Sequence, residues 1–273
     1  AIAVYSDIKR TGHFSCSNEL VNRLYENVIQ SQKSNYLDIP TDCPQRDERL
    51  GWTGDAQVFV KTASYNFDVE RFFNKWLSDL ASEQYDFGGV PNIIPNAMRK
   101  TISPDDSHWC QVAAWGDACV ICPWQIYLTY GSKEILERQI HSMKKWVEGI
   151  RRSGENEYLW NSGRMLGDWL ATDSEDGSWS GASDPYFIAS AFYANSVNLL
   201  AKAMRVIGEN SGEYEQLYQN IVREFKKTYL MPKTQTECSL ALVFDLTDNK
   251  AEIAKKLVRL INENGGKIAT GFV

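Results

Sequence analysis

Apolar residues recur every three or four positions along most of this chain, and this helical period limits its fold more than any other feature of the sequence. Strand signals are few, with short extended pieces predicted at 3–5 and 89–94. The pattern therefore predicts an all-α protein in which amphipathic helices follow one another. The predicted helices cover residues 17–29, 68–80, 113–130, 132–150, 185–207, 213–229, 236–246 and 248–261.

Residues typical of helix ends flank these segments. Ser17, Ser132 and Asp248 each precede an apolar-periodic run, where a side-chain oxygen can accept backbone N–H groups of the first turn. Pro185 suits the first turn of its helix, and Gly208 suits the position just after the last turn. These residues place the predicted boundaries to within a few positions.

The six cysteines are scattered and do not form the framework of a disulfide-rich protein. Cys119 and Cys122 form one C-x-x-C pair inside an apolar run, with no second pair and no histidine at zinc-site spacing. We therefore expect both side chains to pack on a buried helix face, and we predict no metal site and no cofactor. In the same run Pro123 predicts a kink or a break, because proline lacks the N–H that a helix interior needs.

Charge and hydropathy exclude several classes of partner. The chain carries 35 acidic and 29 basic residues, a formal net charge of −6, and no long Lys/Arg cluster, so we expect no nucleic-acid partner. No apolar run approaches the length of about eighteen residues that predicts a membrane span, so we expect no membrane partner. Residues 1–10 lack the layout of a secretory signal, so we expect any such signal to lie outside this chain, and the compartment stays open.

Two predicted connections are too long to be simple turns. Residues 86–108 are rich in Gly and Pro, and residues 153–184 combine Gly, Ser, Asn and Asp with Trp160, Trp169 and Trp179. Loops longer than about fifteen residues in a compact domain are usually functional or disordered, and three tryptophans argue against disorder. A helical frame that displays such loops at one end is well suited to present a binding site.

Residues 38–55 hold the densest chemistry, with five acids, two arginines, one tryptophan, two prolines and two glycines. One interpretation is a surface loop with local ion pairs, and the other is the wall of a pocket. In a pocket, the acids near Glu48 would hold its proton more tightly, as a general acid requires, whereas Arg46 and Arg49 would favour its ionised form. The sequence leaves this balance open. The flat face of Trp52 suits stacking on a sugar ring.

The same residues carry a family resemblance. The stretch at 42–55, Asp-Cys-Pro-Gln-Arg-Asp-Glu-Arg-Leu-Gly-Trp-Thr-Gly-Asp, resembles the signature of the bacterial α-L-rhamnosidases of glycoside hydrolase family 78. Further similarities follow in the expected order at 114–118, 167–170 and 270–272. The resemblance implies a catalytic (α/α)6 barrel, which consists of two concentric rings of six helices.

The resemblance also implies a role for each matching side chain. Glu48 matches the family's general acid, which protonates the glycosidic oxygen as the rhamnosyl bond breaks. Trp52 and Trp115 match aromatic walls of the sugar pocket. For Trp169 the residues alone leave a core position under a loop as the alternative. The remaining matches imply contacts to the rhamnose and are Asp42, Arg46, Asp47, Asp55, Asp168 and Trp169.

An inverting mechanism follows from the resemblance, and it needs a second carboxylate as general base. No residue here matches that base, which the resemblance places beyond residue 273. Eight or nine predicted helices, against twelve in a closed barrel, imply an incomplete barrel with roughly nine of its helices and an exposed apolar edge. We accordingly expect residues 1–16 to be an entry segment from a missing N-terminal β domain, and 17–273 to be the N-terminal part of the six-hairpin catalytic domain.

The expected function is the release of terminal α-L-rhamnose, and the expected partner is a rhamnosylated glycan or glycoside. Two alternatives stay open at this point. One is another glycosidase, or a polysaccharide lyase, built on the same toroid, although a lyase would call for a Tyr or His base. The other is a sugar-binding fragment without catalytic activity, because the chain lacks a match to the base.

Overall fold

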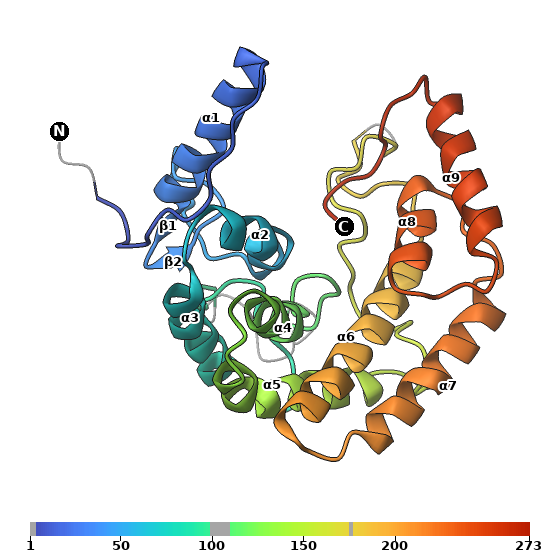
Figure 1. Cartoon of the computed structure of the whole chain (residues 1–273). Helices are drawn as coiled ribbons and strands as arrows, with labels where there is room; N and C mark the ends of the chain where they lie inside the picture. Colours follow the sequence, from blue (N-terminus) through green and yellow to red (C-terminus); the bar gives the residue numbers. More distant parts are fainter. Residues whose placement is uncertain (1–3, 99–109, 175–176) are drawn as a thin grey trace.

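The computed structural model describes residues 4–98, 110–174 and 177–273. Within these ranges the chain forms nine helices that bend round an arc, with α1 at one end and α9 at the other (Figure 1). Two short strands, β1 (Tyr36–Leu37) and β2 (Ile39–Pro40), form a small antiparallel hairpin. The prediction of an all-α architecture is confirmed. The helices are α1 (Glu19–Asn35), α2 (Thr53–Asn66), α3 (Glu70–Glu83), α4 (Ala118–Tyr130), α5 (Glu134–Arg151), α6 (Pro185–Ile207), α7 (Gly212–Thr228), α8 (Gln235–Val243) and α9 (Lys250–Glu263).

The helices form two layers. The even-numbered helices α2, α4, α6 and α8 contact one another in succession, and α3 contacts α5 beside them. The sequence explains this division, because α3, α5, α7 and α9 have one apolar face and charged residues elsewhere, whereas α4 and α6 bury side chains on almost every side. An arc of paired inner and outer helices is part of an α/α toroid, as predicted.

Several predicted elements differ from the structure. Helix α2 was not among the predicted helices, and α4 begins at Ala118 rather than at residue 113. The helix also continues through Pro123, so the proline is not a break. The strand predicted at 89–94 does not form, although Ile93 makes an isolated bridge with Trp52. Of the strand predicted at 3–5, residue 3 lies outside the described residues and the other two are in no strand.

The predicted caps are correct at one helix and displaced at others. Helix α6 begins at Pro185 and ends at Gly208, whose φ is 81°, as predicted. Asn18, rather than Ser17, caps α1 by accepting the N–H groups of its first turn. Lys133 and Asn249 occupy the cap positions that were predicted for the preceding residues, Ser132 and Asp248. Each displacement is a single position, and neither Lys133 nor Asn249 uses its side chain to cap the helix.

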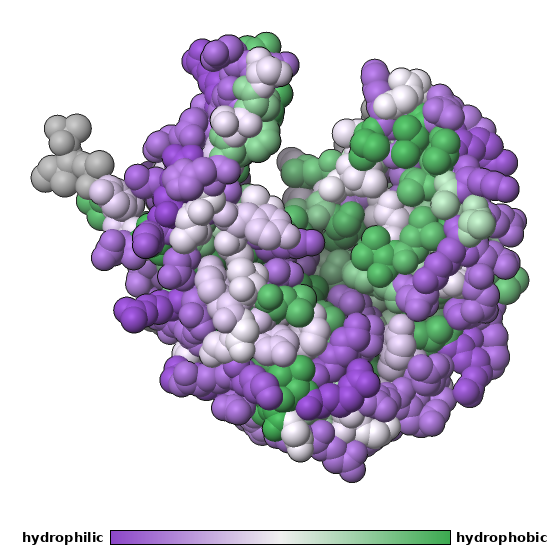
Figure 2. All heavy atoms as spheres, in the orientation of Figure 1, coloured by the Kyte–Doolittle hydropathy of each residue, from purple (hydrophilic) through white to green (hydrophobic). Residues whose placement is uncertain are grey.

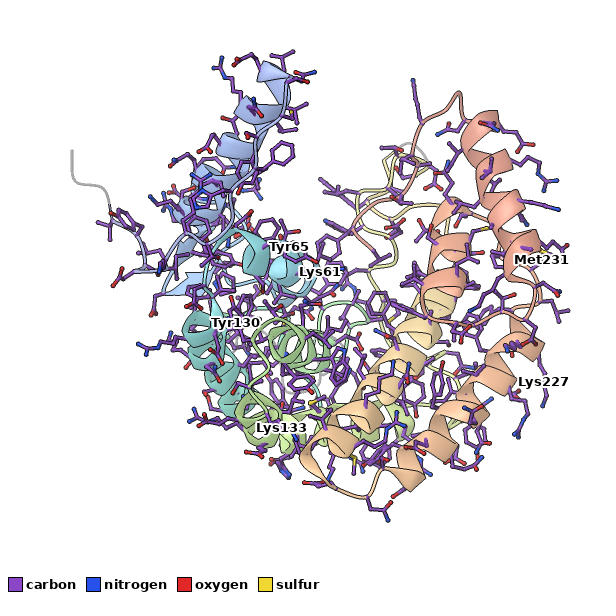
Figure 3. The ribbon with its side chains drawn as sticks, in the orientation of Figure 1. Lys61, Tyr65, Tyr130, Lys133, Lys227 and Met231 are labelled. Atoms are coloured by element: carbon purple, nitrogen blue, oxygen red, sulfur yellow. The ribbon has the colours of Figure 1, made fainter. Side chains whose placement is uncertain are left out.

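Cys119 and Cys122 are fully buried in α4, as predicted. The hydroxyl of Tyr130, at the end of the same helix, donates to the carbonyl of Phe67 (3.2 Å) and accepts the N–H of Val69 (2.8 Å), which ties α4 to the turn between α2 and α3 (Figure 3). In the part of the chain that the structure describes, no helix combines the length and the hydropathy needed to cross a bilayer.

The two ends of the arc carry exposed apolar side chains. They include Leu20 and Leu24 on α1, and Val243 and Val258 on α8 and α9. Figure 2 shows a hollow between these two arms, with apolar residues gathered on the arm that α8 and α9 form. This distribution matches the apolar edge expected of an open helical ring.

Candidate active site

The β1–β2 hairpin leads directly into the motif at 42–55. Its turn lies at Asp38, whose φ of 66° is left-handed. After the hairpin, Asp42 and Leu50 close a loop: the N–H of Asp42 donates to the Leu50 carbonyl (3.0 Å), and the N–H of Leu50 donates to Oδ1 of Asp42 (2.9 Å). The residues between them therefore project from a fixed base.

The end of the motif is anchored on residues 92–94. The Gly51 carbonyl accepts the N–H of Ile94 (2.8 Å), and the N–H of Thr53 donates to the carbonyl of Asn92 (2.8 Å). A Cβ atom at Gly51 would lie 2.1 Å from the Ile94 carbonyl oxygen, so only glycine permits this approach. Trp52 is thereby held between two anchored neighbours, and one side of it borders a mainly apolar cavity of about 170 Å³.

The carboxylate of Glu48 is held from both sides. Trp52 Nε1 donates to its Oε1 (3.0 Å), and Arg46 Nη2 lies 2.6 Å from its Oε2. The Glu48 side chain is 30% exposed, so it stays open to a ligand while its orientation is fixed. The structure thus brings together three predicted site residues, with Arg46 two positions before Glu48 and Trp52 four positions after it.

Cys43 lies between two carboxylates of this loop. Its thiol donates to Oδ2 of Asp42 (2.8 Å), and its Sγ is 3.8 Å from Oε2 of Glu48. Burial raises the pKa of the Cys43 thiol, and the hydrogen bond to Asp42 adds to this, so the proton stays in place to be donated. The sequence motif contained Cys43, but nothing in the residue pattern marked it as a contact of both acids.

The donor atoms of Asp42, Cys43 and Glu48 lie within 4.8 Å of one another, close enough to be considered as metal ligands. The guanidinium of Arg46 is already next to them, 2.6 Å from Glu48 and 3.8 Å from Asp42. Because this cation supplies the positive charge that the carboxylates need, we assign no metal to the cluster.

Asp47 is not brought to the site. Its side chain is fully exposed, and its carboxylate lies 3.6 Å from the guanidinium of Arg49. Both of its neighbours, Arg46 and Glu48, pair with each other instead. The contact to a sugar that the resemblance implied for Asp47 therefore has no support in this geometry.

Asp42, Asp55 and Phe272 line a cavity of about 240 Å³ that also touches α1. Phe272 stacks on Trp115 with ring centroids 4.8 Å apart and an angle of 23° between the rings. A Cβ atom at Gly54 would be 2.9 Å from both rings, so this glycine lets α2 approach them. Trp115 itself is only 3% exposed, which makes Phe272 the ring that faces the cavity and Trp115 its support. The ring that lines the cavity is therefore Phe272, and the predicted wall residue, Trp115, lies behind it.

Asp168 is fully buried and holds the segment that carries Phe272. It accepts the N–H groups of Gly271 (2.9 Å) and Val273 (3.2 Å) and the hydroxyl of Thr236. Asp168 thus supports the segment that forms a wall of the cavity, and the contact to a sugar that the resemblance implies for it stays a prediction. The carbonyl of Trp169 accepts the N–H of Phe272 (2.9 Å), so the two residues hold the segment together.

Left-handed backbone conformations gather next to these candidates. Outside glycine such a conformation costs roughly 1 kcal/mol or more, and it persists where the surrounding structure imposes it, often at functional sites. Three of the five such residues in the described ranges adjoin a predicted site residue. They are Arg49 (φ 50°) beside Glu48, Ala114 (φ 68°) beside Trp115, and Leu170 (φ 59°) beside Trp169.

Asp117 fixes the turn that carries Trp115. Its fully buried carboxylate accepts the N–H of Ala114 (2.8 Å), the indole N–H of Trp146 (3.0 Å) and the hydroxyl of Ser196 (2.5 Å). These donors come from three different parts of the core, so one carboxylate joins α5 and α6 to the turn before α4. The sequence included Asp117 in a matching stretch but gave no reason to select it.

Burial raises the pKa of Asp55 to about 6, and the negative charges of Asp42 and Glu48 act in the same direction. The N–H groups at the start of α2 oppose this shift without cancelling it. The Asp55 carboxyl therefore takes up a proton as the pH falls through about 6.

The raised pKa of Asp55 predicts a pH-dependent effect of Asp55→Asn on stability. The folded protein binds this proton more tightly than the unfolded chain, whose aspartates titrate near 3.9, so the wild type loses stability as the pH rises through about 6. Asn has no proton to lose. We expect the urea midpoint of the variant to rise relative to that of the wild type as the pH increases from about 4 to 7. If the difference in urea midpoint between the variant and the wild type stayed constant or fell as the pH rose, the raised pKa of Asp55 would be contradicted.

Comparison with known proteins identifies the family of this chain. A family model described as the bacterial α-L-rhamnosidase six-hairpin glycosidase domain matches residues 9–273. The chain belongs to this family. An α-L-rhamnosidase of Formosa agariphila is 36% identical over 284 residues, an alignment that covers 100% of this chain and 30% of that protein. The resemblance that the motif at 42–55 carried is thereby confirmed.

Solved α-L-rhamnosidases share the fold. The chain matches the native enzyme of Aspergillus terreus with a TM-score of 0.89 and 37% identity, over 99% of this chain and 32% of that one. It matches the enzyme of Streptomyces avermitilis complexed with L-rhamnose with a TM-score of 0.88 and 31% identity, over 98% and 25%. The chain thus spans about 30% of the length of the rhamnosidases it matches.

Proposed function

We propose that this domain serves the release of terminal α-L-rhamnose from rhamnosylated glycans or glycosides, with Glu48 as general acid. The observation that carries the proposal is the Glu48 carboxylate held between Trp52 and Arg46 in the same loop as Asp42, which lines the cavity. The names of the relatives support the same activity, and one related structure contains L-rhamnose. We infer that residues 17–273 are part of the six-hairpin catalytic domain.

Each side chain has a defined task in this proposal. Trp52 and Arg46 fix the orientation of the Glu48 carboxyl, which donates its proton to the glycosidic oxygen as the bond to the leaving group breaks. Asp42 and Asp55 present oxygens to the cavity, where they accept hydrogen bonds from sugar hydroxyls. The ring of Phe272 covers the apolar face of the sugar.

Inversion of the anomeric centre requires a base that activates water, with about 6.5–9.5 Å between the two carboxyl groups. Asp42 has an oxygen within 4.8 Å of Glu48, which leaves too little room for that water. We therefore keep Asp42 as a binding residue and assign no general base within residues 4–98, 110–174 and 177–273.

Calorimetric titration of the chain with L-rhamnose tests the binding part of this proposal. We expect L-rhamnose to bind and D-glucose and D-galacturonate to bind at least about tenfold more weakly, because the ring of Phe272 in the cavity favours a sugar that carries a methyl group. Asp55→Ala should weaken L-rhamnose binding. Equal affinity for all three sugars would contradict the proposal. The detection of an unsaturated sugar among the products of the natural-length protein would favour a lyase instead.

A further inference from the structure

Three large apolar side chains are exposed on two neighbouring segments near the C-terminus. Leu170 is 59% exposed, Trp179 is 64% exposed and Ile268 is 61% exposed. The N–H of Leu170 donates to the carbonyl of Trp179 (2.7 Å), and the hydroxyl of Thr172 donates to the carbonyl of Ile268 (3.3 Å), so the segments lie side by side. Together they form a local apolar patch on an otherwise polar loop.

The centre of this patch is a stacked pair of indoles. The rings of Trp169 and Trp179 have centroids 5.6 Å apart and an interplanar angle of 13°. Trp169 is partly buried under Trp179, so the outer ring offers its free face to solvent. We call this pair the Trp169–Trp179 platform.

The backbone holds the platform in place. Trp169 pairs with Ser180 in an isolated bridge, the Ser180 hydroxyl donates to the Leu166 carbonyl (2.7 Å), and the N–H of Gly181 donates to the carbonyl of Asp168 (2.9 Å). Leu170, which follows Trp169 in a turn, has a left-handed backbone conformation with a φ of 59°. The outer indole is therefore positioned before any ligand arrives, which lowers the entropy lost on binding.

The platform is continuous with the candidate active site. The carbonyl of Trp169 accepts the N–H of Phe272 (2.9 Å), and the ring of Phe272 lines the cavity that contains Asp42 and Asp55. The segment that carries the inner ring of the platform is thus bonded directly to the segment that carries one wall of the cavity.

We propose that the free face of Trp179 binds the ring to which the rhamnose is attached, and that it forms the subsite for the leaving group. This inference rests on the function proposed above. The ligand chemistry is a six-membered ring with an apolar face, which stacks on the electron-rich face of the indole. Either the next sugar of a glycan or an aryl aglycone supplies such a ring, and Leu170 offers further apolar contact beside it.

The test compares ligands with one ring and with two. In a Glu48→Gln background, which slows turnover of the disaccharide, the chain is titrated with L-rhamnose, with a rhamnosyl-glucose disaccharide and with 4-nitrophenyl 1-thio-α-L-rhamnoside, whose thioglycosidic bond resists hydrolysis. We expect at least one of the two-ring ligands to bind about fivefold more tightly than L-rhamnose, since an aromatic stacking contact is worth up to about a tenfold change. Trp179→Ala should remove this advantage and leave the affinity for L-rhamnose unchanged, and Trp179→Phe should keep most of it.

The outcomes separate this inference from the proposed function. An effect on the disaccharide alone identifies a sugar as the occupant, and an effect on the aryl ligand alone identifies an aglycone. Leu230→Ala, at an apolar side chain that is 80% exposed elsewhere, serves as the matched control and should change nothing. Equal weakening of the binding of all three ligands by Trp179→Ala would overturn the proposed subsite. The absence of any weakening would overturn it as well, and the patch would then be assigned to contact with another protein surface. If L-rhamnose fails to bind the unsubstituted chain, this result contradicts the proposed function itself, whatever the effect of Trp179→Ala.

Discussion

Replacing Glu48 with Gln is expected to lower kcat/KM for rhamnosides of sugars by about 10²- to 10⁴-fold, the range that general acid catalysis contributes. The variant keeps an oxygen for the indole N–H of Trp52 and has nearly the same shape, but its amide cannot donate a proton to the glycosidic oxygen. The measurement is steady-state hydrolysis by the protein at its natural length, with release of L-rhamnose as the readout.

The leaving group makes this test specific for an acid. A nitrophenolate leaves readily without protonation, so Glu48→Gln should affect 4-nitrophenyl α-L-rhamnoside much less than a sugar rhamnoside. Equal losses on both substrates would show that Glu48 binds or positions the sugar instead. Glu134→Gln, which removes only an exposed ion pair with Arg138 on α5, is the control and should leave both rates unchanged.

Replacing Asp117 with Ala is expected to lower the free energy of unfolding by about 3 kcal/mol or more. The substitution leaves the N–H of Ala114, the indole N–H of Trp146 and the hydroxyl of Ser196 without their acceptor in a fully buried place, and each unsatisfied donor costs about 1–3 kcal/mol. Urea denaturation followed by circular dichroism measures the difference.

Ser196→Ala provides the graded comparison for Asp117. It removes one donor and leaves the carboxylate with two, so it should destabilise the chain by only about 1 kcal/mol. A loss at Asp117→Ala no larger than this would mean that water enters the site and replaces the carboxylate. Because the turn from Ala114 to Asp117 carries Trp115, the larger loss should be accompanied by weaker binding of L-rhamnose.

The outer-layer helices were predictable and one inner helix was not. Helices α5 and α7 have apolar stripes that a period of 3.6 residues reveals at once. Helix α2 buries Gly54, Ala63, Ser64 and Asn66 among its residues, and these small or polar side chains give no stripe. Its burial depends on close contact with α4, which is a property of the packed structure and not of the local sequence.

In the candidate site, too, contacts between residues close in sequence were predictable and contacts between residues far apart in sequence were not. The loop that joins Glu48 to Arg46 and Trp52 is short, so its contacts follow from neighbouring residues of the motif. Phe272 comes from the other end of the chain, and its place against Trp115 depends on the whole arc of helices. The burial of Asp168 could not be predicted either, since the sequence does not distinguish an aspartate that accepts backbone N–H groups from one that contacts a sugar.

The dependence of the pocket on Phe272 has a consequence for the order in which the protein becomes competent. The two walls of the cavity come from opposite ends of the chain, and contacts of such large sequence separation form late because loop closure must precede them. During synthesis the acid loop leaves the ribosome well before the segment that carries Phe272. A molecule in which that segment has not yet docked on Trp115 lacks one wall of the cavity, and we expect it to bind a sugar more weakly than the folded molecule does.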